Sequence, residues 1–126
     1  MNYQLASTTI KTRMKAQATV PAEYPNIPFI PPNNEPYLSM RIDFINREAD
    51  EIGGSARVDG AVIVEVRTPE NSSTEVHDAL CASTNLIFSD VDVGPLRFLA
   101  GRVQTLGVMN GRYKSKIVVP FFFLED

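Results

Sequence analysis

Six prolines between residues 21 and 36 constrain the fold of this chain more than any other feature of its sequence. They are Pro21, Pro25, Pro28, Pro31, Pro32 and Pro36. Each proline fixes φ and removes a backbone donor, so neither a helix nor a central strand can run through the segment. Tyr24, Ile27, Phe29 and Ile30 lie between the prolines, and such side chains are not left in water along a free linker. We therefore predict an extended connector over residues 21–36, packed on the protein's own core or on a neighbour.

The connector separates a helix from two strands. Apolar residues at helical spacing predict a short amphipathic helix within residues 1–20, and these are Tyr3, Ala6, Ile10 and Met14. Strict alternation of apolar and polar residues from Leu38 to Phe44 predicts a half-buried strand. A second alternating run, from about Asp59 to Thr68, predicts the next strand. No apolar run approaches the roughly 20 residues of a membrane span, and no signal-peptide pattern opens the chain, so we expect neither membrane insertion nor secretion.

The segment between these strands, residues 46–58, is polar and contains two adjacent glycines. A connection of this length exceeds the two to five residues usual in a hairpin, so we predict a long polar loop that is functional or mobile. Its mixed charge is typical of a segment that becomes ordered on binding. The candidate contact residues are Arg47, Glu48, Asp50, Glu51 and Arg57.

The second half of the chain predicts one helix and a hairpin. Ser72 followed by Glu75 fits a capping box, and an apolar stripe follows, made of Val76, Ala79, Leu80, Ser83, Leu86 and Ile87. Strands are predicted over residues 96–109 and 112–124, joined by a turn at Asn110–Gly111, and Pro120 favours an edge position for the last one. The prediction is one α+β domain over residues 1–126, in the order α-β-β-α-β-β. It has a mainly antiparallel four-stranded sheet with both helices on one face.

Charge is segregated along the chain, although the net charge is only -3. Residues 1–20 and 93–124 carry cations and no acid, whereas residues 23–92 carry 13 acids and four arginines. With an isoelectric point near 5.1, no general affinity for nucleic acid is expected, although the basic ends could contact phosphates locally.

Catalytic chemistry has one candidate, the pair His77 and Cys81, one helical turn apart. A thiol nucleophile and its base could use this spacing, but Cys81 lies in mid-helix, away from the helix N-terminus that would lower its pKa. The favoured interpretation is a packed thiol beside a solvated histidine, with too few ligands for zinc and no cofactor. A small enzyme or ligand-binding domain using this helix remains the alternative from another class.

Aromatic residues near the C-terminus predict an interaction surface. Phe121, Phe122 and Phe123 place rings on both faces of a strand expected at the sheet edge, and such a patch usually meets a partner. The alternative is that helix and sheet cover both faces within one chain. Phe29 of the connector is a further candidate contact.

Three stretches of the sequence together resemble a known family. They are residues 27–38 (IPFIPPNNEPYL), residues 53–60 (GGSARVDG) before a valine-rich strand, and residues 68–73 (TPENSS) entering the second helix. This arrangement, over about residues 24–90, resembles the tail-terminator (tail-completion) proteins of long-tailed bacteriophages. The resemblance rests on turns and strand entries and includes no catalytic signature.

The resemblance implies a structural role. Subunits of the family form a hexameric ring that caps the tail tube, ends its polymerisation and offers a joining surface to the head connector. It implies an α/β subunit with a mainly antiparallel sheet, no reaction and no cofactor. The implied partners are further copies of the chain, the tail-tube protein and a head-completion or connector protein. DNA would pass the lumen without specific binding, and no membrane would be involved.

The implied location is the head–tail junction of the virion, reached from the host cytoplasm during assembly. By position in the pattern, the loop Arg47 to Arg57 would contact the tube or the next subunit. A separate hypothesis from charge is that the acidic stretch faces the lumen, where it would repel passing DNA. Another neck or tail component, a head-completion or a tail-tube subunit, is the nearest alternative.

Overall fold

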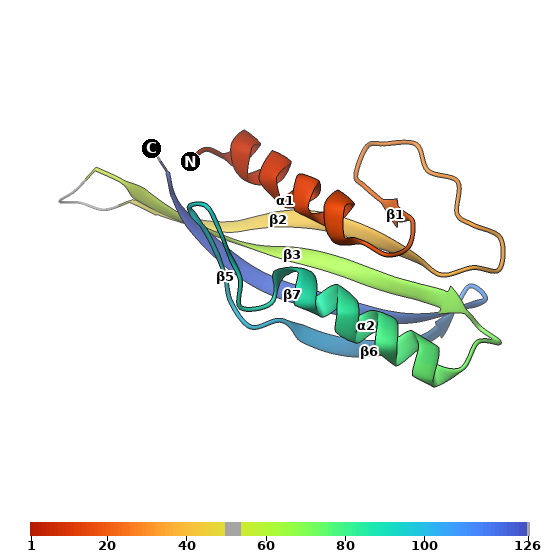
Figure 1. Ribbon diagram of the computed structural model, residues 1–126. Helices are drawn as coiled ribbons and strands as arrows, with labels where there is room; N and C mark the ends of the chain where they lie inside the picture. The colour runs from red at the N-terminus through yellow and green to blue at the C-terminus, as the bar shows by residue number, and fades with distance from the viewer. Residues whose placement is uncertain (50–53, 126) are drawn as a thin grey trace.

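The computed structural model describes residues 1–49 and 54–125. Two helices lie on one face of a twisted sheet, and the other face of the sheet carries no helix (Figure 1). The helices are α1 (Tyr3–Gln17) and α2 (Thr74–Phe88). The strands are β1 (Ala22–Glu23), β2 (Tyr37–Ala49), β3 (Ala56–Pro69), β4 (Asp92–Val93), β5 (Leu96–Phe98), β6 (Arg102–Met109) and β7 (Arg112–Glu125). The predicted α+β class with both helices on one face is confirmed.

The sheet is larger than predicted, and the predicted four-stranded antiparallel arrangement is wrong. Its order is β1-β2-β3-β7-β5-β4, with β6 also pairing β7. The short β1 runs parallel to β2, and the other pairs are antiparallel, so the sheet is mixed. The extra strand β1 forms inside the proline-rich connector because Leu38 N–H points outward from β2 and donates to the Pro21 carbonyl.

The predicted strand over residues 96–109 is broken into β5 and β6, and the cause lies in the strand beside it. Leu99 N–H donates to the Pro120 carbonyl of β7, but Pro120 has no N–H to return, so the ladder is interrupted there. β7 itself lies between β3 and the β5/β6 side. Pro120 therefore belongs to a central strand and lies opposite the break between β5 and β6. The predicted edge position for β7 is wrong.

The predicted loop over residues 46–58 is mostly strand. β2 continues to Ala49 and β3 begins at Ala56, with a bulge at Ile45 where the pairing register shifts. The resulting hairpin arm projects past both helices (Figure 1). Residues 46–49 of this arm are polar or small and exposed, because no described helix packs on the arm there to bury them. The tip, residues 50–53, lies outside the described residues.

Helix α2 is rotated about its axis relative to the prediction. Its N-cap is Ser73, which accepts from Val76 N–H, whereas the Ser72 hydroxyl donates to the Pro69 carbonyl. Two residues of the predicted stripe, Val76 and Leu86, are exposed. The buried side of the helix consists of His77, Leu80, Cys81, Thr84, Ile87 and Phe88. Helix α1 follows its predicted stripe, burying Ala6, Ile10 and Met14.

The proline-rich connector is anchored on the sheet face that lacks helices. The ring of Phe29 packs on the ring of Tyr37, with centroids 5.5 Å apart. The Arg112 guanidinium lies over the same Tyr37 ring and donates to the carbonyls of Pro32 and Glu35. These contacts bury Tyr37 and pack this part of the connector on the protein's own sheet, while Ile30 is 92% exposed.

Candidate subunit interface

The aromatic cluster predicted as a partner surface is divided between the two faces of the sheet. Phe121 and Phe123 are each 1% exposed and lie in the core under the helices. Phe122 lies on the opposite face, with the Arg57 guanidinium 4.0 Å from its ring centroid. The prediction that Phe121 and Phe123 offer a contact surface is therefore wrong, because β7 is central and helices cover that face.

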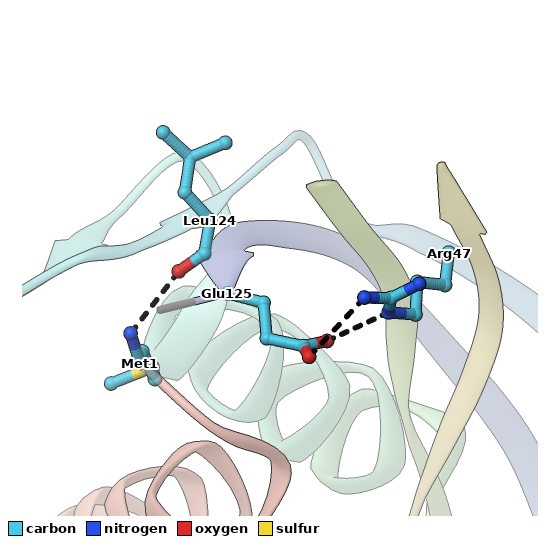
Figure 2. Close-up of polar contacts among 4 residues, drawn as sticks. All are labelled: Met1, Arg47, Leu124 and Glu125. Atoms are coloured by element: carbon cyan, nitrogen blue, oxygen red, sulfur yellow. Dashed lines mark hydrogen bonds and ion pairs between the residues drawn. The ribbon is translucent and has the colours of Figure 1, made fainter. Parts of the chain in front are cut away.

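Arg47, another predicted contact residue, fastens the base of the arm. Its Nε lies 3.0 Å from a carboxylate oxygen of Glu125, and the N-terminal amine of Met1 donates to the Leu124 carbonyl at 3.1 Å (Figure 2). The hydrogen bond and charge of Glu125 raise the pKa of Arg47. The pair reaches from β2 to β7 across β3, on which Val58 stands opposite Arg47 and Ala56 stands opposite Glu125. Met1 and Glu125 thus both form bonds near the base of the arm.

Glu48 and Arg57, also predicted contacts, stand opposite one another on β2 and β3. Both are exposed. Arg57 is held by Asp59, 3.0 Å away, and by the Phe122 ring. Asp50 and Glu51 lie outside the described residues.

The acidic middle of the sequence does not form one acidic face on the described strands. Three carboxylates of β2 and β3 each pair with an arginine two residues away on the same strand, which alternation places on the same face. The pairs are Arg41–Asp43 at 3.3 Å, Arg57–Asp59 at 3.0 Å and Arg67–Glu65 at 3.3 Å. On the same face, at the β6 side, Arg102, Lys114 and Lys116 form no ion pair with another described residue. The β6 side of this face, the open face of the sheet that carries no described helix, is therefore basic.

The first open edge of the sheet is the outer side of β6. Within the described residues, β6 pairs β7 alone, so its other side has no partner strand. Nearly every residue of β6 is exposed. The exposed apolar side chains of this strand are Val103, Leu106, Val108 and Met109. An edge strand with this many exposed apolar residues is a template for pairing with another chain.

The second open edge is the outer half of β2. β1 pairs only Leu38 and Ser39, so residues 40–49 have no strand on their outer side among the described residues. Exposed apolar side chains again lie beside the open stretch. Ile45 is 70% exposed, and Tyr3 of α1, itself 38% exposed, packs edge-on against the ring of Phe44.

The sequence prediction missed a buried polar cluster beneath α2. The ring of His77, predicted to be solvated, is 1% exposed. Its Nδ1 lies 2.8 Å from Thr68 Oγ1 and its Nε2 lies 2.7 Å from Ser115 Oγ. Tyr113 packs edge-on against the ring. Burial lowers the pKa of His77, and this outweighs the opposite effect of the Asp78 charge. The cluster links α2 to β3 and β7 through a neutral imidazole.

Cys81 lies in the same buried layer. Burial raises the pKa of its thiol, and a hydrogen bond with Ser115 lowers it to a smaller degree. The His77 ring nitrogens are both taken by hydroxyls, so the two residues do not form a nucleophile–base pair here. Among the residues that the structure describes, no group of three or more His, Cys, Asp or Glu could hold a metal ion. Within the same residues, no helix has both the length and the apolar character needed to cross a membrane.

The fold is similar to that of solved structures, although the sequences are distant. No protein-family model and no curated protein sequence matches the chain. One solved structure, of a protein named without a function, matches with a TM-score of 0.76 and 16% identity, over 100% of this chain and 97% of that one. A chain in the structure of the virion of a native gene transfer agent particle matches with a TM-score of 0.65 and 18% identity, over 98% of this chain and 100% of that one. The chain therefore shares its fold, along almost its whole length, with a protein of a gene transfer agent virion.

Proposed function

We propose that this chain is a structural protein of a virion and, within that class, a tail terminator: a subunit of a ring that caps the tail tube and stops its growth. The observation that carries the proposal is the full-length likeness of its fold to a chain of the gene transfer agent virion. The resemblance of residues 24–90 to tail-terminator proteins selects this role among virion proteins.

The two open edges of the sheet support a ring. A ring of identical subunits needs two different surfaces on each copy, one to offer and one to receive. The outer side of β6 and the outer half of β2 are two such surfaces on opposite sides of one sheet. Six copies would form the ring, with the tail-tube protein on one side and the head connector on the other. DNA would pass through the lumen without being specifically bound, at the head–tail junction of the virion.

Tube growth in vitro tests this role. Tail-tube protein encoded by the same virus is polymerised with and without the purified chain, and tube lengths are measured by negative-stain electron microscopy. The proposal predicts shorter tubes, each with a ring at one end. A tube-length distribution that is unchanged by the protein, with bare ends, would refute it.

The same experiment separates the nearest alternative. A tail-tube subunit would polymerise by itself into tubes, whereas a tail terminator stops at a single ring. Long tubes formed by the purified chain alone would replace the proposed role with that of a tube subunit.

A further inference from the structure

We infer that copies of this chain join head to tail by antiparallel pairing of β6 in one copy with the outer half of β2, residues 40–49, in the next. The inference rests on the proposed ring and identifies the two surfaces that close it. It makes one sheet continuous from subunit to subunit.

The backbone of β6 has outward-pointing groups. N–H and C=O of one residue point to the same side of a strand, and the side alternates along it. Because Pro120 C=O accepts from Leu99 N–H, the even-numbered residues of β7 direct their backbone groups toward β5 and β6. Their partners on β6, such as Arg102 and Gln104, point inward. Val103 and Thr105 therefore point their N–H and C=O away from the sheet.

The odd-numbered residues of β7 direct their backbone groups toward β3, and their partners on β3 are even-numbered. The odd-numbered residues of β3 therefore point toward β2, and their odd-numbered partners on β2, before the bulge, point toward β3. Met40, Ile42 and Phe44 point their backbone groups away from β3. The pairing with β1 agrees with this, since Leu38 N–H, in the same alternation, donates to the Pro21 carbonyl. The parallel pairing of Glu23 with Ser39 engages Met40 N–H as well, so from Ile42 onward the outward N–H groups have no strand beside them among the described residues.

Side-chain direction makes the two edges compatible. In an antiparallel pair, hydrogen-bonded residues that stand opposite one another point their side chains to the same face. On β6, Val103 and Thr105 pair with Ile117 and Ser115, which are buried on the helix face. On β2, the outward residue Met40 also belongs to the core on the helix face. The edges can therefore pair with the helices of both copies on one side of the continuous sheet.

Strand direction agrees as well. β2, β3, β7 and β6 follow one another in antiparallel pairs, so β6 runs opposite to β2. A rotation about a ring axis keeps the component of each strand direction that lies along the axis, so strands that run up the ring in one copy run up it in every copy. It therefore brings β6 of one copy antiparallel to β2 of the next, which continues the alternation of the sheet.

The open parts of the two edges lie at opposite ends of the sheet. Arg102 pairs with Val118, Val118 with Ile63 and Ile63 with Arg41, so Arg102 and Arg41 are at the same level. From that level β6 runs toward one end of the sheet and the open half of β2 runs toward the other. Pairing them requires each copy to be shifted along the strands relative to the last, and closing a sheet into a ring requires such a stagger.

Charge favours the same arrangement. Antiparallel overlap places the start of β6, with Arg102, beside the end of the open half of β2, with Glu48. Arg41 and Arg47 already have carboxylate partners within the chain, so Glu48 is the carboxylate that this part of β2 offers. The cation of Arg102 meeting the carboxylate of Glu48 helps to set the register and speeds association.

Hydrogen exchange tests the pairing directly. Amide exchange is compared at equal pH between assembled and dilute, unassembled wild-type protein. The amides of Val103, Thr105, Ile42 and Phe44 should exchange at least about tenfold more slowly in the assembly, while the amide of the exposed Ile30 should not change. Equal exchange of the edge amides in both states would overturn the inference.

A proline substitution gives an independent test. Val103→Pro removes an outward N–H and leaves the bonds between β6 and β7 intact, and Val103→Thr is the matched control. We expect Val103→Pro to be a folded monomer by circular dichroism and native mass, and Val103→Thr to assemble like the wild type. Rings formed by Val103→Pro would overturn the edge pairing and leave the proposed ring standing. A wild-type chain that never assembles, alone or on tubes, would instead contradict the proposed function.

Discussion

At the scale of single residues, the most informative side chain is His77. It lies in the core with a hydroxyl on each ring nitrogen, and burial, which lowers its pKa, outweighs the opposite effect of the Asp78 charge. A neutral imidazole can donate one hydrogen bond and accept the other, so it satisfies both hydroxyls. An imidazolium would have to donate at both nitrogens and remain buried without a facing carboxylate.

Stability should therefore fall in weak acid because of His77. Above about pH 6.5 the ring is neutral in both the folded and the unfolded chain, and it contributes no pH dependence. Below that pH, His77 binds a proton in the unfolded chain but stays neutral in the folded chain, because burial lowers its pKa there. The free energy of unfolding therefore decreases as the pH falls, until the pH reaches the pKa of His77 in the folded chain. Urea unfolding between pH 7.5 and 5.5 measures this decrease. In His77→Gln the part due to this ring should disappear, and an unchanged slope would contradict the buried neutral ring.

Loss of the ring should also cost stability at neutral pH. His77→Ala leaves a cavity and removes the partner of the buried Ser115 hydroxyl, so the free energy of unfolding should fall by about 2 to 4 kcal/mol. His77→Gln, which can still hydrogen-bond, should cost less. Urea unfolding at pH 7.5 compares the two, and equal losses would mean that packing alone explains the role of the residue.

Gly60 is a second position where one atom matters. A Cβ there would lie 2.6 Å from the Asp43 carbonyl oxygen and 2.6 Å from Cζ of Phe121. Gly60→Ala should therefore lower the free energy of unfolding by about 1 to 3 kcal/mol, because the core ring and a neighbouring strand must both move. Thermal unfolding measures the loss. Ser55→Ala, at an exposed site just before β3, is the control and should change stability by less than about 0.5 kcal/mol.

At the scale of elements, the hairpin arm is the part to which the proposed interface assigns a charge role. Glu48→Lys should weaken assembly, because it places a cation beside Arg102 of the next copy. The midpoint concentration of assembly by light scattering should rise several-fold, more at low salt than at high salt. Glu70→Lys, which makes the same charge change at an exposed site after β3, is the control. An equal effect of both substitutions would show that only net charge matters.

Part of this element structure could be predicted from sequence, where a local signal coincides with the tertiary outcome. Strict alternation located the start of β2 and the middle of β3, and Asn110–Gly111 gave the β6–β7 turn, in which both residues adopt positive φ of 54° and 74°. The arm was missed because its pairing depends on backbone hydrogen bonds between polar strands. The break after β5 was missed because Pro120, which causes it, lies on another strand.

The rotation of α2 shows a different limit. His77, Cys81, Thr84 and Phe88 recur at helical spacing just as the predicted stripe does, but three of them are polar or small. Hydrophobicity therefore favoured Val76 and Leu86, which are exposed. Only the hydroxyls of Thr68 and Ser115, supplied by two strands, make His77 a core residue. A polar residue that is buried through distant partners gives no local signal.

At the scale of the whole molecule, the charges that are segregated along the sequence differ more between the two edges of the sheet than between its two faces. The carboxylates of β2 and β3 on the open face are paired with arginines, and the unpaired cations gather toward β6. The open half of β2 ends in Glu48, on the other side of the sheet. Each copy thus carries unpaired cations toward β6 and the carboxylate of Glu48 at the opposite edge, which suits head-to-tail association.

The mass of the assembled protein tests the central claim most directly. Native mass spectrometry of the wild-type chain, at concentrations used for tube capping, should give one closed species of six copies, about 84 kDa for a chain of 14.0 kDa. Val103→Pro under the same conditions should give the single chain. A wild-type spectrum of monomers alone, or an open ladder of sizes without a preferred six, would contradict the account.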